Sequence, residues 1–307
     1  MSEDKSPALR HLRVGDELIK FSTGLRAKGA DFDHADNVIF VHGFTAHGSY
    51  LNGLAEYFDD NGFNSFIFNY NSYRGIEKAA ETLHSLIAGI NNLSKSEMCA
   101  EGILGRKKFS FVCHSMGGLV ARAFTYRNGA CQYINRVVTL GTPHSGTLGN
   151  SEILDYFLRW SEFVTEAVPG MTAKACLSAQ ELTSKDPAPM LLDRLQLENP
   201  AACEIPVLTI SGGKQWLEFG NNRLFNSAWN SKIQRLLSPG QNDGLVSETS
   251  SSLQAVGFMH CLPNNQHYCD YPEFSQINHS NLINNQDLSI KMMGWLKQGA
   301  DALGTQI

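Results

Sequence analysis

The sequence predicts an α/β fold, in which helices cover both faces of a mostly parallel central sheet. Short, unbroken apolar runs recur along the chain, as strands buried on both faces require, and longer amphipathic segments separate them. The chain has 307 residues, of which 42% are hydrophobic and 18% charged. This composition suits a folded domain with a sizeable core. We therefore expect residues 1–307 to form a single domain.

Six apolar runs are the expected strands, at residues 38–41, 65–70, 108–113, 134–140, 206–210 and 256–261. Residues 9–21 are an expected edge strand or hairpin before them. Helical periodicity marks four segments, at residues 50–60, 76–93, 117–127 and 282–297. Strands that alternate with helices in this way favour parallel neighbours joined by crossover helices.

The alternation stops at residues 145–206, where the sequence has no clear strand. The first part of this stretch, residues 153–164, has the pattern of a strongly apolar helix. Such helices either pack on the core or form a mobile lid over a site. We expect a lid inserted at residues 146–205, and its candidate substrate-binding side chains are Phe157, Trp160 and Phe163.

The clearest chemical motif is Cys113-His114-Ser115-Met116-Gly117, which follows an expected strand and opens an expected helix. This context is typical of the tight turn that presents a nucleophilic serine at a sheet edge. Such a turn needs small residues two positions before and after the serine, and Cys113 and Gly117 are small. Ser115 is therefore the candidate nucleophile. The Met116 N–H lies at the expected helix N-terminus and is a candidate oxyanion donor.

A second oxyanion donor is expected in His42-Gly43-Phe44, which ends the first buried strand. A loop at this place can offer a backbone N–H to a developing oxyanion, and Phe44 N–H is the candidate. Gly43 allows the backbone to come close. We expect the His42 ring to be structural.

A serine hydroxyl needs a base, and the base needs an orienting acid. The chain order typical of such sheets is serine, acid, histidine. His279 lies just before the last expected helix and is the candidate base, with His260 and His267 as rivals. Asp243, in the segment Asn242-Asp243-Gly244, is the candidate acid. The weaker candidates Asp270 and Asp287 follow the last expected strand.

Taken in this order, the segments resemble the α/β-hydrolase superfamily and, within it, bacterial triacylglycerol lipases and esterases. Two segments narrow the resemblance, Gly141-Thr142-Pro143-His144-Ser145-Gly146 and Asn242-Asp243-Gly244-Leu245-Val246-Ser247. The resemblance spans roughly residues 36–298. It departs at Cys113, where glycine or alanine is usual, and in the lack of a secretion signal. Some relatives carry a structural calcium, but the resemblance does not assign its ligands to residues of this sequence, so we predict no calcium site.

This resemblance implies an α/β-hydrolase fold with a helical lid. It also implies a serine ester hydrolase of the lipase or esterase type, which cleaves acyl esters of lipids through an acyl-enzyme. The implied triad is Ser115, Asp243 and His279, and the implied oxyanion donors are Phe44 and Met116. Thioesterases, phospholipases, lipid deacylases and acyltransferases on the same fold are alternatives, and so is a binding module without activity.

The remaining features argue against other classes. A net charge of −5 speaks against phosphate-neutralising nucleic-acid binding. A metal site at His42, His47, Glu81 and His84 lacks ligand spacing, and no nucleotide loop occurs, so we expect no metal or cofactor. The expected partners are an acyl ester and, as an alternative to simple core packing of residues 153–164, a lipid interface.

The N-terminus and the cysteines leave the location open. Met1 to Lys5 carry acidic residues, and no apolar stretch follows that would form a signal peptide or a spanning helix. A cytoplasmic location is the default, with signal-independent export or a trimmed leader as alternatives. Seven scattered cysteines favour reduced thiols, although Cys261 and Cys269 are close enough to pair in an oxidising compartment.

Overall fold

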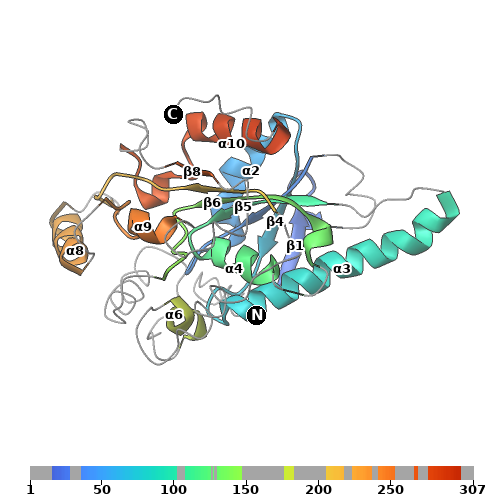
Figure 1. Ribbon diagram of the computed structural model, residues 1–307, viewed down its shortest axis with the longest axis horizontal. Helices are drawn as coiled ribbons and strands as arrows, with labels where there is room; N and C mark the ends of the chain where they lie inside the picture. Colours follow the sequence, from blue (N-terminus) through green and yellow to red (C-terminus); the bar gives the residue numbers. More distant parts are fainter. Residues whose placement is uncertain are drawn as a thin grey trace, which may run out of the picture.

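A mostly parallel sheet lies between two layers of helices (Figure 1). The computed structural model describes residues 16–27, 36–101, 108–125, 127, 130–146, 176–182, 205–217, 223–236, 241–252, 266–268 and 276–298. In these ranges eight strands pair in the order β2-β1-β4-β3-β5-β6-β7-β8. The ladders from β4 to β8 are parallel, and β1 pairs antiparallel with β2 and β4. The predicted fold class is therefore confirmed.

The strands are β1 (Glu17–Lys20), β2 (Leu25–Arg26), β3 (Asn37–Val41), β4 (Asn64–Asn69), β5 (Phe109–His114), β6 (Ile134–Leu140), β7 (Val207–Ile210) and β8 (Gln266–Tyr268). The α-helices are α2 (Asn52–Asp60), α3 (Ile76–Glu101), α4 (Met116–Thr125), α6 (Leu177–Leu182), α8 (Arg223–Leu236), α9 (Glu248–Ser251) and α10 (Gln286–Gln298). Three 3-10 helices are η3 (Gly48–Leu51), η4 (Ala130–Tyr133) and η9 (His279–Asn281). No helix in the described ranges combines the length and the apolar composition needed to cross a membrane.

Five of the six predicted strands are confirmed, as β3 to β7, and β1 is an edge strand within the expected residues 9–21, although its antiparallel partner β2 lies beyond that range. The sixth predicted strand, at residues 256–261, lies outside the described residues. Residues 266–268, where the sequence predicted no strand, form β8 beside β7. Their Gln-His-Tyr sequence has no apolar run, the signal on which strand prediction relies.

The helices differ from expectation at their ends. α3 extends to Glu101, eight residues beyond the predicted end at residue 93. α10 begins at Gln286 and not at residue 282, because a 3-10 turn precedes it. Asn285 then accepts a hydrogen bond from the Leu288 N–H and caps the new helix. α8 and the one-turn α9 were not predicted.

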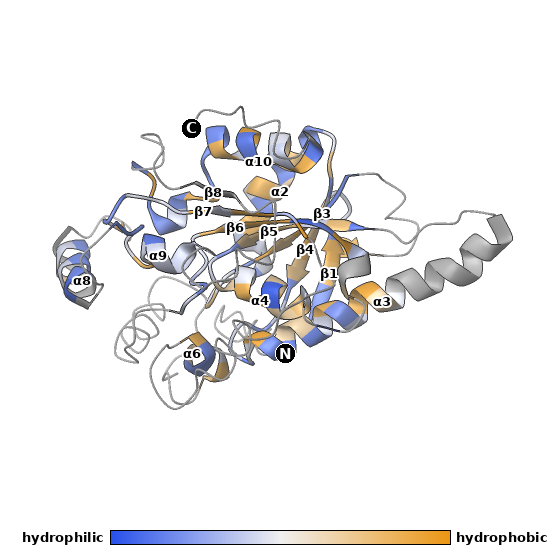
Figure 2. Cartoon of the chain, viewed as in Figure 1, coloured by the Kyte–Doolittle hydropathy of each residue, from blue (hydrophilic) through white to orange (hydrophobic). Residues whose placement is uncertain are grey.

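Two hydrophobic cores lie on opposite faces of the sheet, and the strand period of two sorts the side chains between them. On β3, Ile39 and Val41 join the core under α3 and α4, while Val38 and Phe40 join the core under α2 and α10. Figure 2 shows the central strands mostly in hydrophobic colours, between helices that carry both hydrophobic and hydrophilic residues. Burial on both faces explains why the parallel strands read as unbroken apolar runs.

Removing one aromatic ring from the core under α2 and α10 should measure how much the packing of this helix layer on the sheet contributes to the free energy of unfolding. Phe58 is fully buried, and its ring packs edge-on against Phe40 with 5.2 Å between centroids. We expect Phe58→Ala to lower the free energy of unfolding by about 3–5 kcal/mol in urea titrations. The matched control is Ile290→Ala on α10, because that side chain is 52% exposed. A comparable loss in both variants would contradict this packing.

Candidate active site

Ser115 occupies a strained turn between β5 and α4. Its φ of 53° lies in the left-handed region, which side chains other than glycine rarely adopt. Its N–H donates to Leu140 O at 2.8 Å, and its carbonyl accepts from Thr142 Oγ1 at 2.8 Å. Backbone strain of this kind persists where surrounding contacts over-determine it, and it is frequent at functional sites.

Glycines around the turn let three segments meet. A Cβ on Gly117 would overlap the carbonyl oxygens of Val41 and His42 at the end of β3. A Cβ on Gly43 would lie 2.9 Å from Ser115 Cβ. The end of β3 and the Ser115 turn are therefore packed backbone against backbone, as an oxyanion pocket beside a nucleophile requires.

The candidate oxyanion donors Phe44 and Met116 lie in the segments that this packing brings together. Met116 is the first residue of α4, so its N–H has no acceptor within the helix. Phe44 follows Gly43 and precedes Thr45, whose φ of 59° makes it, with Ser115, one of the two described non-glycine residues in the left-handed region. Both strained residues thus belong to the same site.

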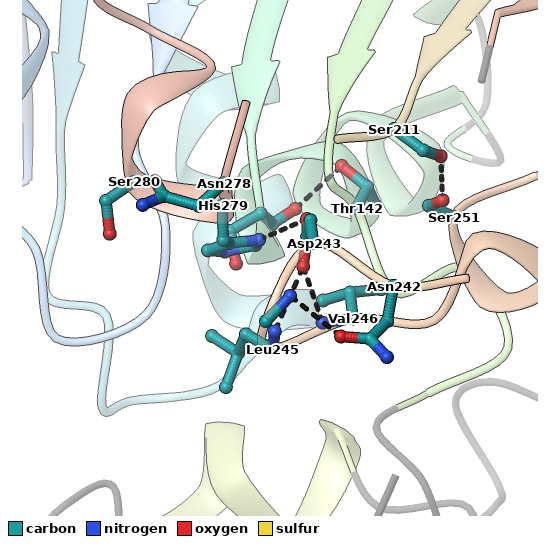
Figure 3. A network of polar contacts seen from close by, with 12 residues as sticks. Thr142, Ser211, Asn242, Asp243, Leu245, Val246, Ser251, Asn278, His279 and Ser280 are labelled. Atoms are coloured by element: carbon teal, nitrogen blue, oxygen red, sulfur yellow. Dashed lines mark hydrogen bonds and ion pairs between the residues drawn. The ribbon is translucent and has the colours of Figure 1, made fainter. Parts of the chain in front are cut away.

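The candidate base and acid are in direct contact (Figure 3). His279 Nδ1 lies 2.7 Å from Asp243 Oδ2, and the His279 backbone N–H donates to Asp243 O at 2.8 Å. The other carboxylate oxygen of Asp243 accepts from the backbone N–H groups of Leu245 at 3.1 Å and Val246 at 2.8 Å. Asp243 is 1% exposed, so these donors replace its water and leave His279 Nδ1 as the proton donor to Oδ2.

The structure brings the Ser115 turn and the His279–Asp243 pair to the same edge of the sheet. Leu140 accepts the Ser115 N–H, and a Cβ on the next residue, Gly141, would lie 2.7 Å from Asp243 Oδ2 and 2.8 Å from His279 Nδ1. The Ser115 hydroxyl itself hydrogen-bonds none of the described residues. Catalytic hydrogen bonds are often long in a structure without substrate.

The rival candidates for the base and the acid lie in other elements or outside the described residues. His267 is in β8, and Asp287 is exposed in the first turn of α10. The remaining candidates lie outside the described residues; they are His260, Asp270, the proposed pair Cys261 and Cys269, and the lid candidates Phe157, Trp160 and Phe163. In the described ranges no cluster of three or more His, Cys, Asp or Glu side chains could hold a metal ion.

Sequence reasoning missed a buried arginine beside the site. Arg122 on α4 donates from Nη1 to His144 O at 2.9 Å, and His144 Nε2 lies 3.1 Å from Thr139 Oγ1. These contacts fix the loop of residues 141–146 that follows β6. The sequence carries no signal for this contact, because Arg122 and His144 lie on different elements of the fold.

One described part of the expected insertion, α6, lies against the N-terminus of α3. Ser178 Oγ accepts from the Gly75 N–H at 2.8 Å, and the Glu181 carboxylate accepts from the Ile76 N–H. Burial raises the pKa of Glu181, and the Ile76 hydrogen bond opposes that rise. The loop before α3 also carries Tyr73, whose ring packs edge-on against Phe44 at 5.7 Å. α6 therefore contacts the same loop whose Tyr73 packs against Phe44, the candidate oxyanion donor.

His114, the residue before Ser115, is the other group that sequence reasoning missed. Its Nε2 lies 2.9 Å from His279 O, and its ring is buried between Tyr50 and His279. Burial first, and then the neighbouring His279, lowers the pKa of His114 to about 3. The ring is therefore neutral at ordinary pH. Its place within the serine motif was the available signal, but the motif predicts only the turn.

Two helix glycines provide a matched test of the turn. Gly117→Ala should lower the free energy of unfolding by about 1–3 kcal/mol, because its Cβ would meet backbone oxygens that cannot rotate away. Gly53→Ala on α2 should leave it unchanged or raise it by up to about 1 kcal/mol, since no atom lies within 4 Å of that Cβ. Urea titrations measure both. A Gly117→Ala protein as stable as Gly53→Ala would contradict the close approach.

The pKa of His114 predicts a dependence of stability on pH. The unfolded chain binds a proton at this ring below about pH 6.5, whereas the folded chain does so only near pH 3. This contribution to stability is complete above pH 6.5 and is lost as the pH falls. From pH 7 to pH 5, the free energy of unfolding of wild type should therefore fall by about 2 kcal/mol relative to that of His114→Phe. Urea titrations at pH 7 and 8 should give an unchanged difference, and a constant difference down to pH 5 would contradict the prediction.

Comparisons with known proteins agree with this fold. Residues 48–215 match the family described as PGAP1-like alpha/beta domain. No sequence among the curated proteins matches. Among solved structures, a mature lipase of Bacillus licheniformis matches with a TM-score of 0.54 and 19% identity, covering 85% of this chain and 92% of that one.

Two more distant matches have the same architecture. A lipase-esterase related protein of Clostridium acetobutylicum gives a TM-score of 0.50 at 13% identity, over 91% of this chain and 99% of its own. Lipase B of Aspergillus fumigatus gives 0.52 at 13%, over 85% of this chain and 52% of its own. The family match covers more than half of the chain, so the chain belongs to the PGAP1-like alpha/beta domain family and has a lipase- and esterase-like α/β-hydrolase fold.

Proposed function

We propose that the protein is a serine hydrolase that cleaves acyl esters, with lipids as the substrate class. The observation that carries the proposal is the 2.7 Å contact between His279 Nδ1 and the buried Asp243 carboxylate, at the edge that holds the strained Ser115 turn. A histidine oriented by a carboxylate is the arrangement that activates a serine hydroxyl. The fold alone would not indicate activity, because α/β-hydrolase-like folds serve many functions.

The proposed reaction has two acyl-transfer steps. Ser115 Oγ attacks the ester carbonyl carbon while His279 Nε2 takes the hydroxyl proton, and Asp243 holds the Nδ1–H of the resulting imidazolium. The oxyanion is stabilised by the N–H groups of Phe44 and Met116. His279 then protonates the departing alcohol. Water, deprotonated by the same histidine, attacks the acyl-enzyme and releases the carboxylic acid.

Exposed apolar side chains beside the site support a lipid-like substrate. Of the five large hydrophobic residues exposed in the described ranges, two lie beside the His279 turn: Tyr50 and Trp216. Tyr50 donates to Ser280 O, next to His279, and Trp216 O accepts from Asn278 Nδ2. Apolar side-chain surface that stays exposed beside a site favours contact with an acyl chain or a lipid surface. The lid at residues 146–205 is part of the same proposal.

A fluorophosphonate probe tests the activated serine. Intact mass should show one adduct on wild type and none on Ser115→Ala. Labelling of His279→Ala should be slow because no base remains, and Asp243→Asn should label and turn over roughly 10⁴-fold more slowly because the histidine tautomer is wrong. The matched control is Ser85→Ala on α3, where Ser85 Oγ donates only to Glu81 O, and it should label like wild type.

Substrate profiling then separates the alternatives. Turnover of p-nitrophenyl esters of increasing length should rise with chain length for a lipid-directed enzyme. Preference for acyl-thioesters would favour a thioesterase, preference for phospholipids a phospholipase or lipid deacylase, and transfer to added alcohols an acyltransferase. A folded wild type that forms no adduct, with or without detergent, would contradict the proposal and favour a binding module.

A further inference from the structure

His114 joins the strand of the candidate nucleophile to the turn of the candidate base. It is the last residue of β5 and directly precedes Ser115. Its Nε2 is 2.9 Å from His279 O, and the two imidazole rings lie 4.8 Å apart between centroids. A carbonyl oxygen only accepts hydrogen bonds, so Nε2 carries the proton and donates it.

The other ring nitrogen shows that His114 acts in its neutral form. With the proton on Nε2, Nδ1 is an acceptor, and this buried atom has no partner in the described part of the chain. It lies beside Gly43, 3.5 Å from where a Cβ would be. A proton on Nδ1 would be a buried, unpaired donor beside His279, and the two rings would repel each other whenever His279 becomes an imidazolium.

The hydrogen bond fixes the backbone of the His279 turn from one side while Asp243 fixes it from the other. The His279 N–H donates to Asp243 O at 2.8 Å, and the His279 carbonyl accepts from His114. Tyr50 adds a third contact by donating to Ser280 O at 3.2 Å, with its ring 5.6 Å from the His114 ring. With both of its backbone polar groups held, the His279 ring keeps few ways to move other than rotation about its side-chain bonds.

We propose that His114 is a positioning residue, which sets the placement of His279 relative to Ser115 and Asp243 through the hydrogen bond from its neutral Nε2–H to the His279 carbonyl. The proposal rests on the function proposed above for Ser115, Asp243 and His279. The last residue of β5 and the turn residue that follows it would then supply the anchor of the base and the nucleophile. A small displacement of a base can cost a large factor in rate while substrate binding is unchanged.

Three substitutions at His114 separate the hydrogen bond from packing. In His114→Gln the side-chain amide reaches the place of Nε2 and keeps the donor. In His114→Asn the amide reaches only the place of Nδ1, and in His114→Phe the ring stays but the donor is lost. Phe and Asn should lower kcat on a soluble ester by about 10- to 100-fold with little change in KM, and Gln should recover most of it. His84→Phe on α3, whose ring packs on Phe124 and Tyr133, is the control for loss of a histidine elsewhere.

A double-mutant cycle distinguishes positioning from a general loss of stability. If His114 acts through the His279–Asp243 pair, His114→Phe should cost little in a protein that already carries Asp243→Asn. Urea titrations at pH 8 identify any variant that is not fully folded under assay conditions. Equal rate losses for His114→Phe in both backgrounds would overturn the proposal.

A spectroscopic signal tests the placement without relying on turnover. The His279 Nδ1–H bonded to a carboxylate should give a far-downfield proton resonance in wild type and in His114→Gln, and the signal should broaden or vanish in His114→Phe. An unchanged resonance and unchanged labelling in His114→Phe would overturn the role of His114. Absence of Ser115 labelling in wild type, with the resonance still dependent on His114, would instead contradict the proposed function and leave the positioning contact supported.

Discussion

The left-handed turn at Ser115 is the constraint on which the rest of the site depends. A turn that sharp at the end of β5 brings α4 directly against the end of β3, and there is room only for backbone. Only glycine fits at positions 43 and 117, because a Cβ there would overlap neighbouring atoms. Their absence of Cβ atoms allows the Phe44 loop, the α4 N-terminus and the serine to converge within one small volume. The parallel sheet makes this convergence possible, because β3, β5, β6 and β7 all end at the same edge.

The second constraint is burial of the Asp243 carboxylate, because the hydration that it loses has to be replaced by hydrogen bonds within the protein. Asp243 is nearly inaccessible to water, and an isolated charge in that position would be prohibitively unstable. Two backbone N–H groups of its own loop and the His279 ring supply the missing hydrogen bonds. The Asn242–Ser247 bridge closes that loop. The loop of residues 242–247 therefore takes the place of water around the Asp243 carboxylate. Its turn needs a left-handed residue directly after Asp243, and Gly244 has a φ of 96°.

The sequence predicted what depends on local pattern and could not show what depends on distant packing. The strands β3 to β7 follow from apolar runs, and Ser115, Asp243 and His279 from motif and chain order. β8 has a polar sequence and gains its strand geometry from pairing with β7. His114 and Arg122 were not identified, because their partners, His279 and His144, lie 165 and 22 residues away. Such pairings have no periodicity to detect.

The ring of His42, expected to be structural, controls the direction of a candidate donor. Its Nδ1 lies 3.0 Å from Gly43 O, and its Nε2 accepts from the Tyr70 N–H, so the proton is on Nδ1 and is donated to the Gly43 carbonyl. A trans peptide is planar, with its C=O and N–H on opposite sides. Holding the Gly43 carbonyl therefore aims the Phe44 N–H away from His42. The His42 side chain thus orients the N–H of the candidate oxyanion donor, and its own ring is kept in place by stacking on Tyr70 at 4.2 Å.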